Sequence, residues 1–350
     1  MRRGPTGPIK EIDEPVKPCL LNFYGYVVEI GRSHERVADH LCRDFSFFLT
    51  PTTDRIDLHL EAHHRPPDFH LLPDCEASYI GPRNIRYKHG SQSYYDYFGE
   101  ALLIEDHKTA VVSSESIDLL REVFYLYILS KVGLYLDKRG LHRLHAASFS
   151  CAGEAALLLC PSGGGKSTTA FHLLSKEPYG LISEDSPLVG VDGDIYPFPL
   201  CLGCKGKPPA NVPEKHLRKV SRMEFDPKTL IDLDFFEGKL ERAPLPPGPI
   251  LVGVRHSGET SRIEPTTRLA LFRFLVRDLV IGMGIFQGVE FLFRNRLSGL
   301  ARHSLVMASR LRSAIALSRR GRPYLFRMGR NIDRNIATLD DFLSASQATR

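Results

Sequence analysis

A glycine-rich turn near the middle of the chain constrains the fold more than any other stretch. The segment from Ala155 to Thr169 reads AALLLCPSGGGKSTT, so an apolar run enters three glycines and Lys-Ser-Thr then opens a helix. Glycines let the backbone turn its N–H groups inward without clashes from Cβ atoms, and a helix N-terminus adds further donors. The pattern predicts a phosphate cradle between a strand and a helix. A chance glycine turn followed by Lys-Ser is the alternative interpretation.

This cradle assigns roles to particular residues. We expect Lys166 to reach the β- and γ-phosphates of a nucleotide and Ser167 to bind Mg²⁺. The standard P-loop pattern has a glycine at position 160, where this chain has Cys160. Cysteine is small, so we expect the turn to be retained. The residues expected to bind the nucleotide are Ser162, Gly163, Gly164, Gly165, Lys166, Ser167 and Thr168.

A pair of acids follows the cradle at the distance of one helix and a turn. A helix is expected over 166–176, and the short strand 181–183 then delivers Glu184 and Asp185. A carboxylate on a strand beside the cradle strand can hold the Mg²⁺ shell, and a second can accept the proton of an attacking hydroxyl. An exposed Glu-Asp-Ser-Pro turn is the alternative. The hairpin expected from 145–150 and 154–159 places His145 on its first strand, which pairs with the cradle strand.

Length and composition limit the number of domains, the use of disulfides and the contact with membranes that we expect. The 350 residues suggest about two domains with ample apolar content for a core. Seven cysteines without regular spacing predict no disulfide framework and favour a reducing cytoplasm. No apolar stretch is long enough to cross a membrane, so we expect a cytoplasmic protein without a membrane partner.

The positive charge is concentrated in the last third of the chain. The whole chain has a formal net charge of +5, yet residues 251–350 contain 17 arginines, no lysines and 7 acids. Arginines suit planar carboxylate and phosphate groups, while a solvated basic face is the alternative. Because no DNA- or RNA-binding motif accompanies them, a nucleic-acid partner is not favoured.

Local patterns divide the chain into three parts. Residues 1–18 predict a flexible arm, 19–113 a small α+β domain, and 114–345 a second domain that contains the cradle. In the α+β domain we expect a helix over 33–48, a loop over 65–88, and strands at 23–30, 54–62, 94–104 and 110–113. Ser114 is expected to cap a long helix that ends near Lys138, with the boundary just before it.

Several other residues could carry chemistry but also have plain structural interpretations. His59, His63, His64 and His70 lack ligand spacing and are interpreted as surface residues, and the lone pair Cys201 and Cys204 is not expected to bind zinc. Two pairs of basic residues could contact phosphate or substrate, or could simply lie in solvated turns. These pairs are Lys205 with Lys207 and Arg255 with His256, and the sequence leaves both interpretations open.

The order of these parts resembles the catalytic domain of HPr kinase/phosphorylase, a family related in fold to PEP carboxykinase. The matching parts are His145, the cradle from Pro161 to Ser167, the strand 181–183 with its acids, and the hairpin after them. The resemblance implies an α/β domain with a mixed sheet, here preceded by a smaller α+β domain, and it implies self-association as a homo-oligomer. By position it makes Glu184 the base and places Asp185 near Mg²⁺, with His145 assisting and Lys166 stabilising phosphate charge.

Departures from the family narrow the expectation. Cys160 stands for a glycine, Glu184 stands for an aspartate, and the family's later glutamate-isoleucine-arginine-glycine signature is not found. The chain therefore looks like divergent HPr-kinase-like proteins, such as lasso-peptide precursor kinases. The implied function is ATP- and Mg²⁺-dependent phosphorylation of a serine on a peptide or small protein, for instance the C-terminal serine of a lasso-peptide precursor. A small-molecule kinase and a nucleotide-binding regulatory protein without transfer activity are the alternatives.

Overall fold

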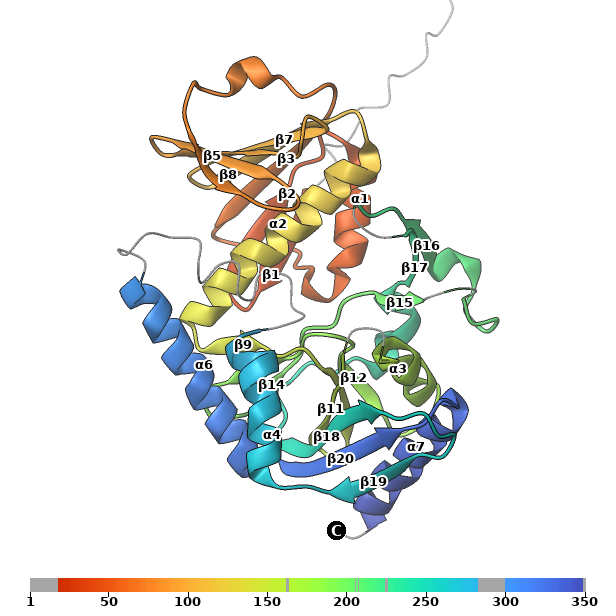
Figure 1. Cartoon of the computed structure of the whole chain (residues 1–350). Coiled ribbons are helices and arrows are strands. Elements are labelled where there is room, and N and C mark those ends of the chain that lie inside the picture. The colour runs from red at the N-terminus through yellow and green to blue at the C-terminus, as the bar shows by residue number, and fades with distance from the viewer. Residues whose placement is uncertain are drawn as a thin grey trace, which may run out of the picture.

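The computed structural model describes residues 18–161, 164–204, 206, 208–223, 226–282 and 300–348. Almost all of the expected arm lies outside these ranges, as do Ser162, Gly163, Lys205 and Lys207. The described chain is mixed α/β, with two large mixed sheets and their helices lying one above the other (Figure 1). The expected α/β class with a mixed sheet is confirmed at this level.

The upper sheet of Figure 1 comes from the N-terminal part of the chain. Within the described residues it has the strand order β1-β2-β3-β8-β7-β6-β5-β4, with β3 parallel to both β2 and β8. The strands are β1 (Cys19–Phe23), β2 (Tyr26–Ile30), β3 (Leu58–His64), β4 (Ala77–Ile80), β5 (Ile85–His89), β6 (Gln92–Asp96), β7 (Ala101–Asp106) and β8 (Thr109–Ser114).

Three predictions for this sheet are wrong. The strand expected over 94–104 is two strands, β6 and β7, with the turn residues 97–100 between them. The loop expected over 65–88 contains β4 and most of β5, whose polar side chains hid the strand pattern. The single strand expected over 23–30 is a hairpin, because Tyr24 and Gly25 both take positive φ values of 55° and 94°. The Asn22 side chain accepts from the Gly25 N–H at 2.7 Å and holds this turn.

Helices α1 (Glu35–Asp44) and α2 (Ile117–Lys138) accompany the upper sheet. The cap of α2 is Ser116, whose side chain accepts from the Leu119 N–H at 3.2 Å, and not the predicted Ser114, which donates to the Glu100 carbonyl. The buried apolar residues of α2 lie in the same core as those of the upper sheet. We therefore describe the sheet with α1 and α2 as the N-terminal unit, while the domain boundary predicted before residue 114 stays a prediction.

The lower sheet has the strand order β12-β10-β11-β18-β20-β19 within the described residues. Its strands are β10 (Ala147–Cys151), β11 (Glu154–Leu159), β12 (Gly180–Ser183), β18 (Pro247–Arg255), β19 (Arg262–Pro265) and β20 (Arg322–Met328). The predicted β10–β11 hairpin is confirmed. Strand β10 separates β12 from β11, however, so the prediction that the acids follow a strand beside the cradle strand is wrong.

The directions of the strands place the carboxyl ends of several of them at one edge of this sheet. Strands β11, β18 and β20 are parallel, and β12 runs the same way because both β11 and β12 are antiparallel to β10. The carboxyl ends of these strands, and the start of β10, therefore meet at one edge. Ligands of open α/β sheets bind at such an edge.

Helices cover both faces of the lower sheet. Along β11, Ala156 and Leu158 pack in a core with α3 (Lys166–Leu174) and α7 (Ile332–Ala348), while Ala155 and Leu157 face a core with α4 (Arg268–Leu275) and α6 (Leu300–Arg320). This period of two is the pattern of a strand buried on both faces. A π-helical turn (Val276–Val280) continues α4. We refer to this sheet, its helices and the small sheets below as the C-terminal unit.

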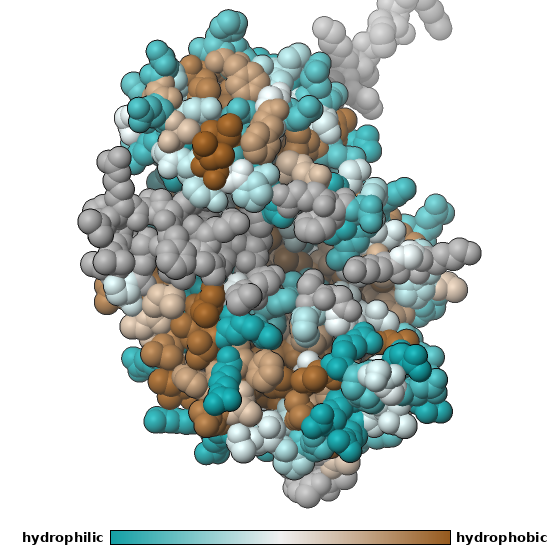
Figure 2. All heavy atoms as spheres, in the orientation of Figure 1, coloured by the Kyte–Doolittle hydropathy of each residue, from teal (hydrophilic) through white to brown (hydrophobic). Residues whose placement is uncertain are grey.

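Short elements complete the C-terminal unit. One small sheet consists of β9 (Leu141–Arg143), β13 (Leu188–Gly190) and β14 (Ile195–Tyr196), and another of β15 (Leu202–Cys204), β16 (Leu217–Val220) and β17 (Lys228–Ile231). The 3₁₀ turns of the described chain are Ser46–Phe48, Phe69–Leu71, Glu214–His216 and Leu233–Lys239. The face in Figure 2 shows hydrophilic and hydrophobic residues mixed over both units, with a hydrophobic area at the lower left, on the C-terminal unit.

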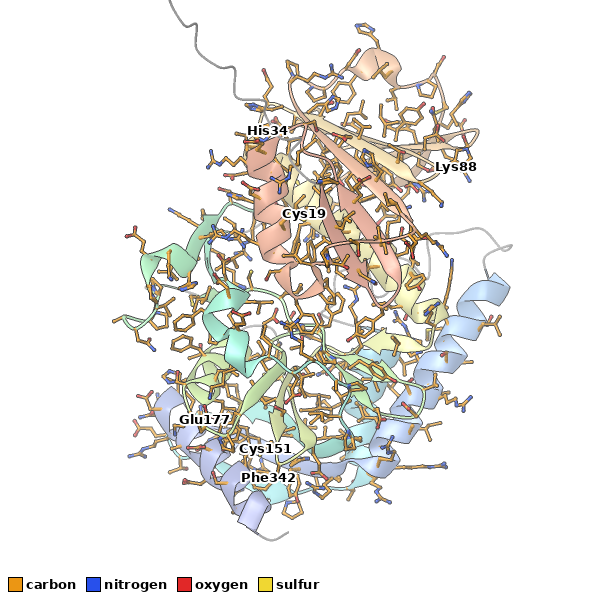
Figure 3. All side chains as sticks on the ribbon, turned by 180° about the vertical axis from the view of Figure 1, so that it is seen from behind. Cys19, His34, Lys88, Cys151, Glu177 and Phe342 are labelled. Atoms are coloured by element: carbon orange, nitrogen blue, oxygen red, sulfur yellow. A yellow bond between two sulfur atoms is a disulfide. The ribbon has the colours of Figure 1, made fainter. Side chains whose placement is uncertain are left out.

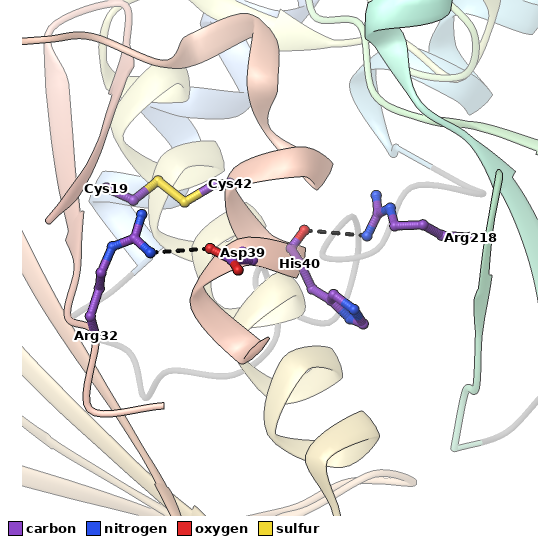
Figure 4. The surroundings of a disulfide bond; sticks show 6 residues. All are labelled: Cys19, Arg32, Asp39, His40, Cys42 and Arg218. Carbon is purple, nitrogen blue, oxygen red and sulfur yellow. Dashed lines mark hydrogen bonds and ion pairs between the residues drawn. A yellow bond between two sulfur atoms is a disulfide. The ribbon is translucent and has the colours of Figure 1, made fainter. Parts of the chain in front are cut away.

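A cluster of buried charges joins the two units. Asp44 of α1 accepts from Arg121 of α2 and from Arg218 of β16, both at 2.8 Å, and Arg218 also donates to Asp232 at 2.7 Å. These four side chains are at most 6% exposed. The His40 carbonyl adds a contact with Arg218 at 3.4 Å (Figure 4). We refer to Asp44, Arg121, Arg218 and Asp232 as the interunit cluster.

One disulfide lies near this cluster. Cys19 of β1 and Cys42 of α1 are bonded, with their Cα atoms 6.4 Å apart (Figure 4). The cysteine spacing did not indicate this pair, which spans two elements. Figure 3 places Cys19 in the N-terminal unit and Cys151, which is outside this bond, in the C-terminal unit. Within the described residues, no helix has the length and hydropathy needed to span a membrane.

Candidate active site

Four segments meet at the carboxyl edge of the lower sheet. Strand β11 leads into the cradle, β12 leads into Glu184 and Asp185, and β18 ends at Arg255. His145 precedes β10, which runs in the opposite direction, so it reaches the same edge. Residues far apart in the sequence therefore come together here because of strand direction.

The described part of the cradle requires its glycines. Gly165 has a left-handed φ of 98° and directly precedes α3. A Cβ atom on Gly164 would lie 2.8 Å from the Pro161 carbonyl oxygen and 2.9 Å from the Cys160 sulfur. The first N–H groups of a helix have no partners within the helix. A tight glycine turn therefore places donors of α3 toward the edge, as an anion site needs.

Cys160 fits where the standard pattern has glycine. Its side chain is buried, and a Cβ atom on Gly253 of the neighbouring strand β18 would lie 2.9 Å from the Cys160 Cβ. Glycine at 253 therefore leaves room for this cysteine. Burial raises the pKa of the thiol, although the charges of Lys166 and Arg255 act to lower it. Cys160 is thus a neutral packing residue.

Lys166 is the centre of a compact group of polar residues. Its Nζ lies 2.8 Å from His145 Nε2, 3.0 Å from the Cys160 carbonyl and 3.4 Å from Asp185 Oδ1. His145 Nε2 is also 3.4 Å from Asp185 Oδ1. We refer to His145, Lys166 and Asp185 as the cradle cluster.

The cradle cluster is open on one side. Lys166 and His145 are buried, whereas the Asp185 side chain is 50% exposed. Burial acts to raise the pKa of Asp185, but the contacts with His145 and Lys166 outweigh it and hold the pKa below its ordinary value. Asp185 is therefore an ionised carboxylate beside the lysine, with room for a cation or a phosphate on its outer side.

Glu184 lies in a different environment from its neighbour. The residue is 7% exposed, and its Oε2 accepts from the Leu200 N–H at 3.0 Å. Burial and the charge of Asp185 raise the pKa of Glu184 to about 8. Two adjacent carboxyl groups with separated pKa values are typical of acid–base sites. The structure thus joins His145, Lys166 and Asp185 by direct contact and places Glu184 beside them, in contact with Leu200.

The remaining predicted site residues lie at the start of α3. Ser167 is partly exposed and Thr168 is exposed, so both are accessible from the edge. The Ser167 hydroxyl and the Asp185 carboxylate are hard oxygen ligands, which suit Mg²⁺. The described residues include no group of three or more His, Cys, Asp or Glu side chains arranged to hold a metal ion. A Mg²⁺ ion here would therefore depend on phosphate oxygens and water for its other ligands.

The structure resolves one open choice and adds residues that sequence reasoning missed. Arg255 donates to the Gly164 carbonyl at 3.2 Å and so lies against the cradle, whereas His256 contacts the Thr260 carbonyl of its own turn. Asp278 is buried, and its carbonyl lies 3.5 Å from the His145 N–H. No signal in the sequence marked Asp278, because its contact uses the backbone.

A second group of residues has the connectivity of a hydrolase triad. His142 lies 2.8 Å from both Asp137 Oδ1 and Ser309 Oγ. The histidine is fully buried, and Ser309 lies in the middle of α6, where backbone N–H groups are used within the helix. A serine nucleophile needs nearby free donors for an oxyanion. We interpret this group as a structural link between α2, β9 and α6.

Comparisons with known proteins add no family. Neither a scan against protein-family models nor a search of curated proteins finds a match to this chain. The resemblance to HPr kinase/phosphorylase therefore stays an expectation drawn from the sequence motifs.

Proposed function

We propose that this protein is an ATP- and Mg²⁺-dependent kinase of the HPr-kinase-like type. It transfers the γ-phosphoryl group to a serine hydroxyl of a peptide or small protein. The observation that carries this proposal is the 3.4 Å contact between Lys166, at the start of α3, and Asp185, which follows a different strand. A lysine after a left-handed glycine and a carboxylate at the same sheet edge are the two halves of a phosphoryl-transfer site.

The residues present fit a nucleotide with its metal. Gly164, where an added Cβ would collide with the loop, and Gly165, with its left-handed φ, form a tight turn at the start of α3 that directs backbone donors outward. Lys166 would hold the β- and γ-phosphates, and Ser167 with Asp185 would hold Mg²⁺. When bound, Mg²⁺ neutralises charge on the transferring phosphate oxygens.

The two acids would then have separate roles. Glu184 accepts the proton of the serine hydroxyl while the hydroxyl oxygen bonds to the γ-phosphorus and the bond from that phosphorus to the ADP oxygen breaks. Its pKa of about 8 favours a base that works near neutral pH. Asp185 stays ionised beside Lys166, and His145 orients that lysine through the 2.8 Å contact. Arg255 can stabilise charge on the phosphates from the neighbouring strand.

The fold around the site supports the same proposal. A P-loop strand paired antiparallel with its predecessor is unusual for a plain doubly wound sheet, and the motif order His145, cradle, acids and hairpin follows the HPr-kinase-like pattern. A lasso-peptide precursor with a C-terminal serine is one acceptor of the proposed class. The proposed protein works in the cytoplasm and self-associates.

The test is intact-mass spectrometry of candidate acceptors after incubation with protein, ATP and Mg²⁺. A panel of serine-ended peptides is compared with matched alanine-ended peptides, and Lys166→Met is the enzyme control. We expect phosphate mass on serine-ended peptides with the wild-type protein only. ATP binding without phosphate on any peptide or small hydroxyl compound would overturn the proposal in favour of a nucleotide-binding regulator.

A further inference from the structure

Lys228, at the start of β17, is a cation that the site described above does not use. It is partly buried, and within the described residues it forms neither a hydrogen bond nor an ion pair. Lys166, in contrast, contacts His145, the Cys160 carbonyl and Asp185. A partly buried ammonium without a partner is costly, so its position calls for a ligand.

The position of Lys228 is set by the neighbouring strand β15. A Cβ atom on Gly203 would lie 1.6 Å from Lys228 Cε and 1.8 Å from its Nζ, so the lysine stem lies directly across this glycine. Strands β15 and β17 are paired antiparallel. The chain just before β15 also holds Glu184, through the Leu200 N–H. One segment, from Leu200 to Gly203, thus carries the contacts of both the acid and the amine.

Electrostatics agree with this placement. Burial lowers the pKa of Lys228, and among the charges that act on it, Glu184 and Asp185 raise the pKa while Arg222 lowers it. Both acids therefore act on the charge of Lys228, although within the described residues it forms no ion pair with either. Lys166, in contrast, contacts Asp185 directly from the cradle.

We propose that Lys228 is a catalytic residue, which contacts the phosphoryl group from the acceptor side during transfer. This inference rests on the proposed kinase function. Phosphoryl transfer places negative charge on the phosphoryl oxygens next to two carboxyl groups, and it needs cations on both sides. Lys166 serves the side of the departing ADP. Lys228 has no competing partner in the described chain, and its stem lies across Gly203, three residues after the Leu200 N–H that binds Glu184, so it can act on the other side.

The first test compares kcat, acceptor KM and ATP affinity, using the serine-ended peptide that gains phosphate. Lys228→Ala is expected to lower kcat by about 10²–10³-fold, as loss of a transition-state donor does, with ATP affinity and acceptor KM nearly unchanged. Lys228→Arg should restore part of kcat. A rise in acceptor KM at constant kcat would overturn the proposal, since it would make Lys228 a binding residue. An unchanged kcat would overturn it as well.

A second test uses the glycine under the lysine. Gly203→Ala should displace Lys228, because the three nearest atoms to the new Cβ all belong to that side chain. We expect a loss of kcat like that of Lys228→Ala, and no further loss in the double variant, since alanine at 228 has no stem to displace. Gly238→Ala is the matched control, because nothing lies within 4 Å of its Cβ position. Additive losses would contradict the geometry.

A third readout does not depend on turnover. The affinity for MgADP with aluminium fluoride, which mimics the transferring group, should fall in Lys228→Ala by at least tenfold, while the affinity for MgADP alone should not change. Equal affinities of both proteins for the mimic would overturn the proposal. A wild-type protein that binds MgADP but phosphorylates nothing would instead overturn the proposed function, so the two failures are distinguishable.

Discussion

Two groups of charged residues in this protein differ in how completely they are paired. In the interunit cluster, Asp44 and Asp232 each meet arginines at 2.7–2.8 Å, and all four side chains are at most 6% exposed. In the cradle cluster, the contacts of Asp185 are 3.4 Å long and its side chain is 50% exposed. One group is closed to ligands and the other is open.

The comparison shows how to separate structural from functional charge. Buried ions that satisfy each other leave no capacity for a ligand, and removing one partner strands the rest. An open group keeps a shifted pKa and an accessible side, as Asp185 does. Strong pairing alone is therefore no sign of an active site, whereas incomplete pairing at a sheet edge is.

The largest expected effect is on transfer in the open group. Lys166→Met keeps most of the length of the side chain and removes its charge, so phosphate charge in the transition state loses its main partner. We expect transfer to fall by about 10³-fold or more, as for removal of a key electrostatic group. The measurement is the initial rate of phosphopeptide formation. Melting temperature without nucleotide is the control, and a rate within tenfold of wild type would remove Lys166 from the mechanism.

The closed group should respond through stability instead. Asp44→Asn leaves buried Arg121 without its carboxylate and Arg218 with Asp232 alone, so we expect a loss of about 3–5 kcal/mol in the free energy of unfolding. Urea denaturation measures it. Asp39→Asn, on the same helix, is the matched control, because its pair with Arg32 is exposed and should contribute less than about 1 kcal/mol. Equal losses in the two variants would show that burial of the cluster is unimportant.

The open group should also respond to pH. The proposed base Glu184 must be deprotonated to accept a proton, and its pKa of about 8 lies above that of an ordinary glutamate. The transfer rate should therefore rise with pH and level off above pH 8, with about a tenfold loss from pH 7 to pH 6. The pKa of Asp185 is lowered, so it stays ionised throughout this range. A flat profile from pH 6 to pH 9 would rule out Glu184 as the base.

The smallest effect is expected at the residue that departs from the standard pattern. Cys160→Gly removes a buried thiol, so a loss of about 1 kcal/mol in stability is expected from the small cavity. The cradle backbone needs no side chain at this position, so ATP affinity should change less than about threefold. Isothermal titration with MgATP checks it. A loss of affinity of tenfold or more would mean that Cys160 shapes the nucleotide site directly.

Local sequence reasoning was successful where short-range physics dominates. The β10–β11 hairpin, the glycine turn and the strand that ends before Glu184 are all present, because turn residues and apolar runs act within a few positions. It failed where polar residues hid the pattern of a strand, and where it chose the wrong serine as a helix cap. Strands β4 and β5 have mostly exposed or half-exposed residues, and the cap of α2 lies two residues later than predicted.

The sequence by itself determined which residues could carry the chemistry, namely the glycines, Lys166, His145 and the two acids. Only the tertiary structure decided their relations. It placed β10 between β11 and β12 and brought Asp185 into contact with Lys166. It also let Glu184 accept a hydrogen bond from the Leu200 N–H and laid the Lys228 side chain across Gly203. The physical reason is range: turns depend on neighbouring residues, whereas strand order and burial depend on how distant apolar faces pack together.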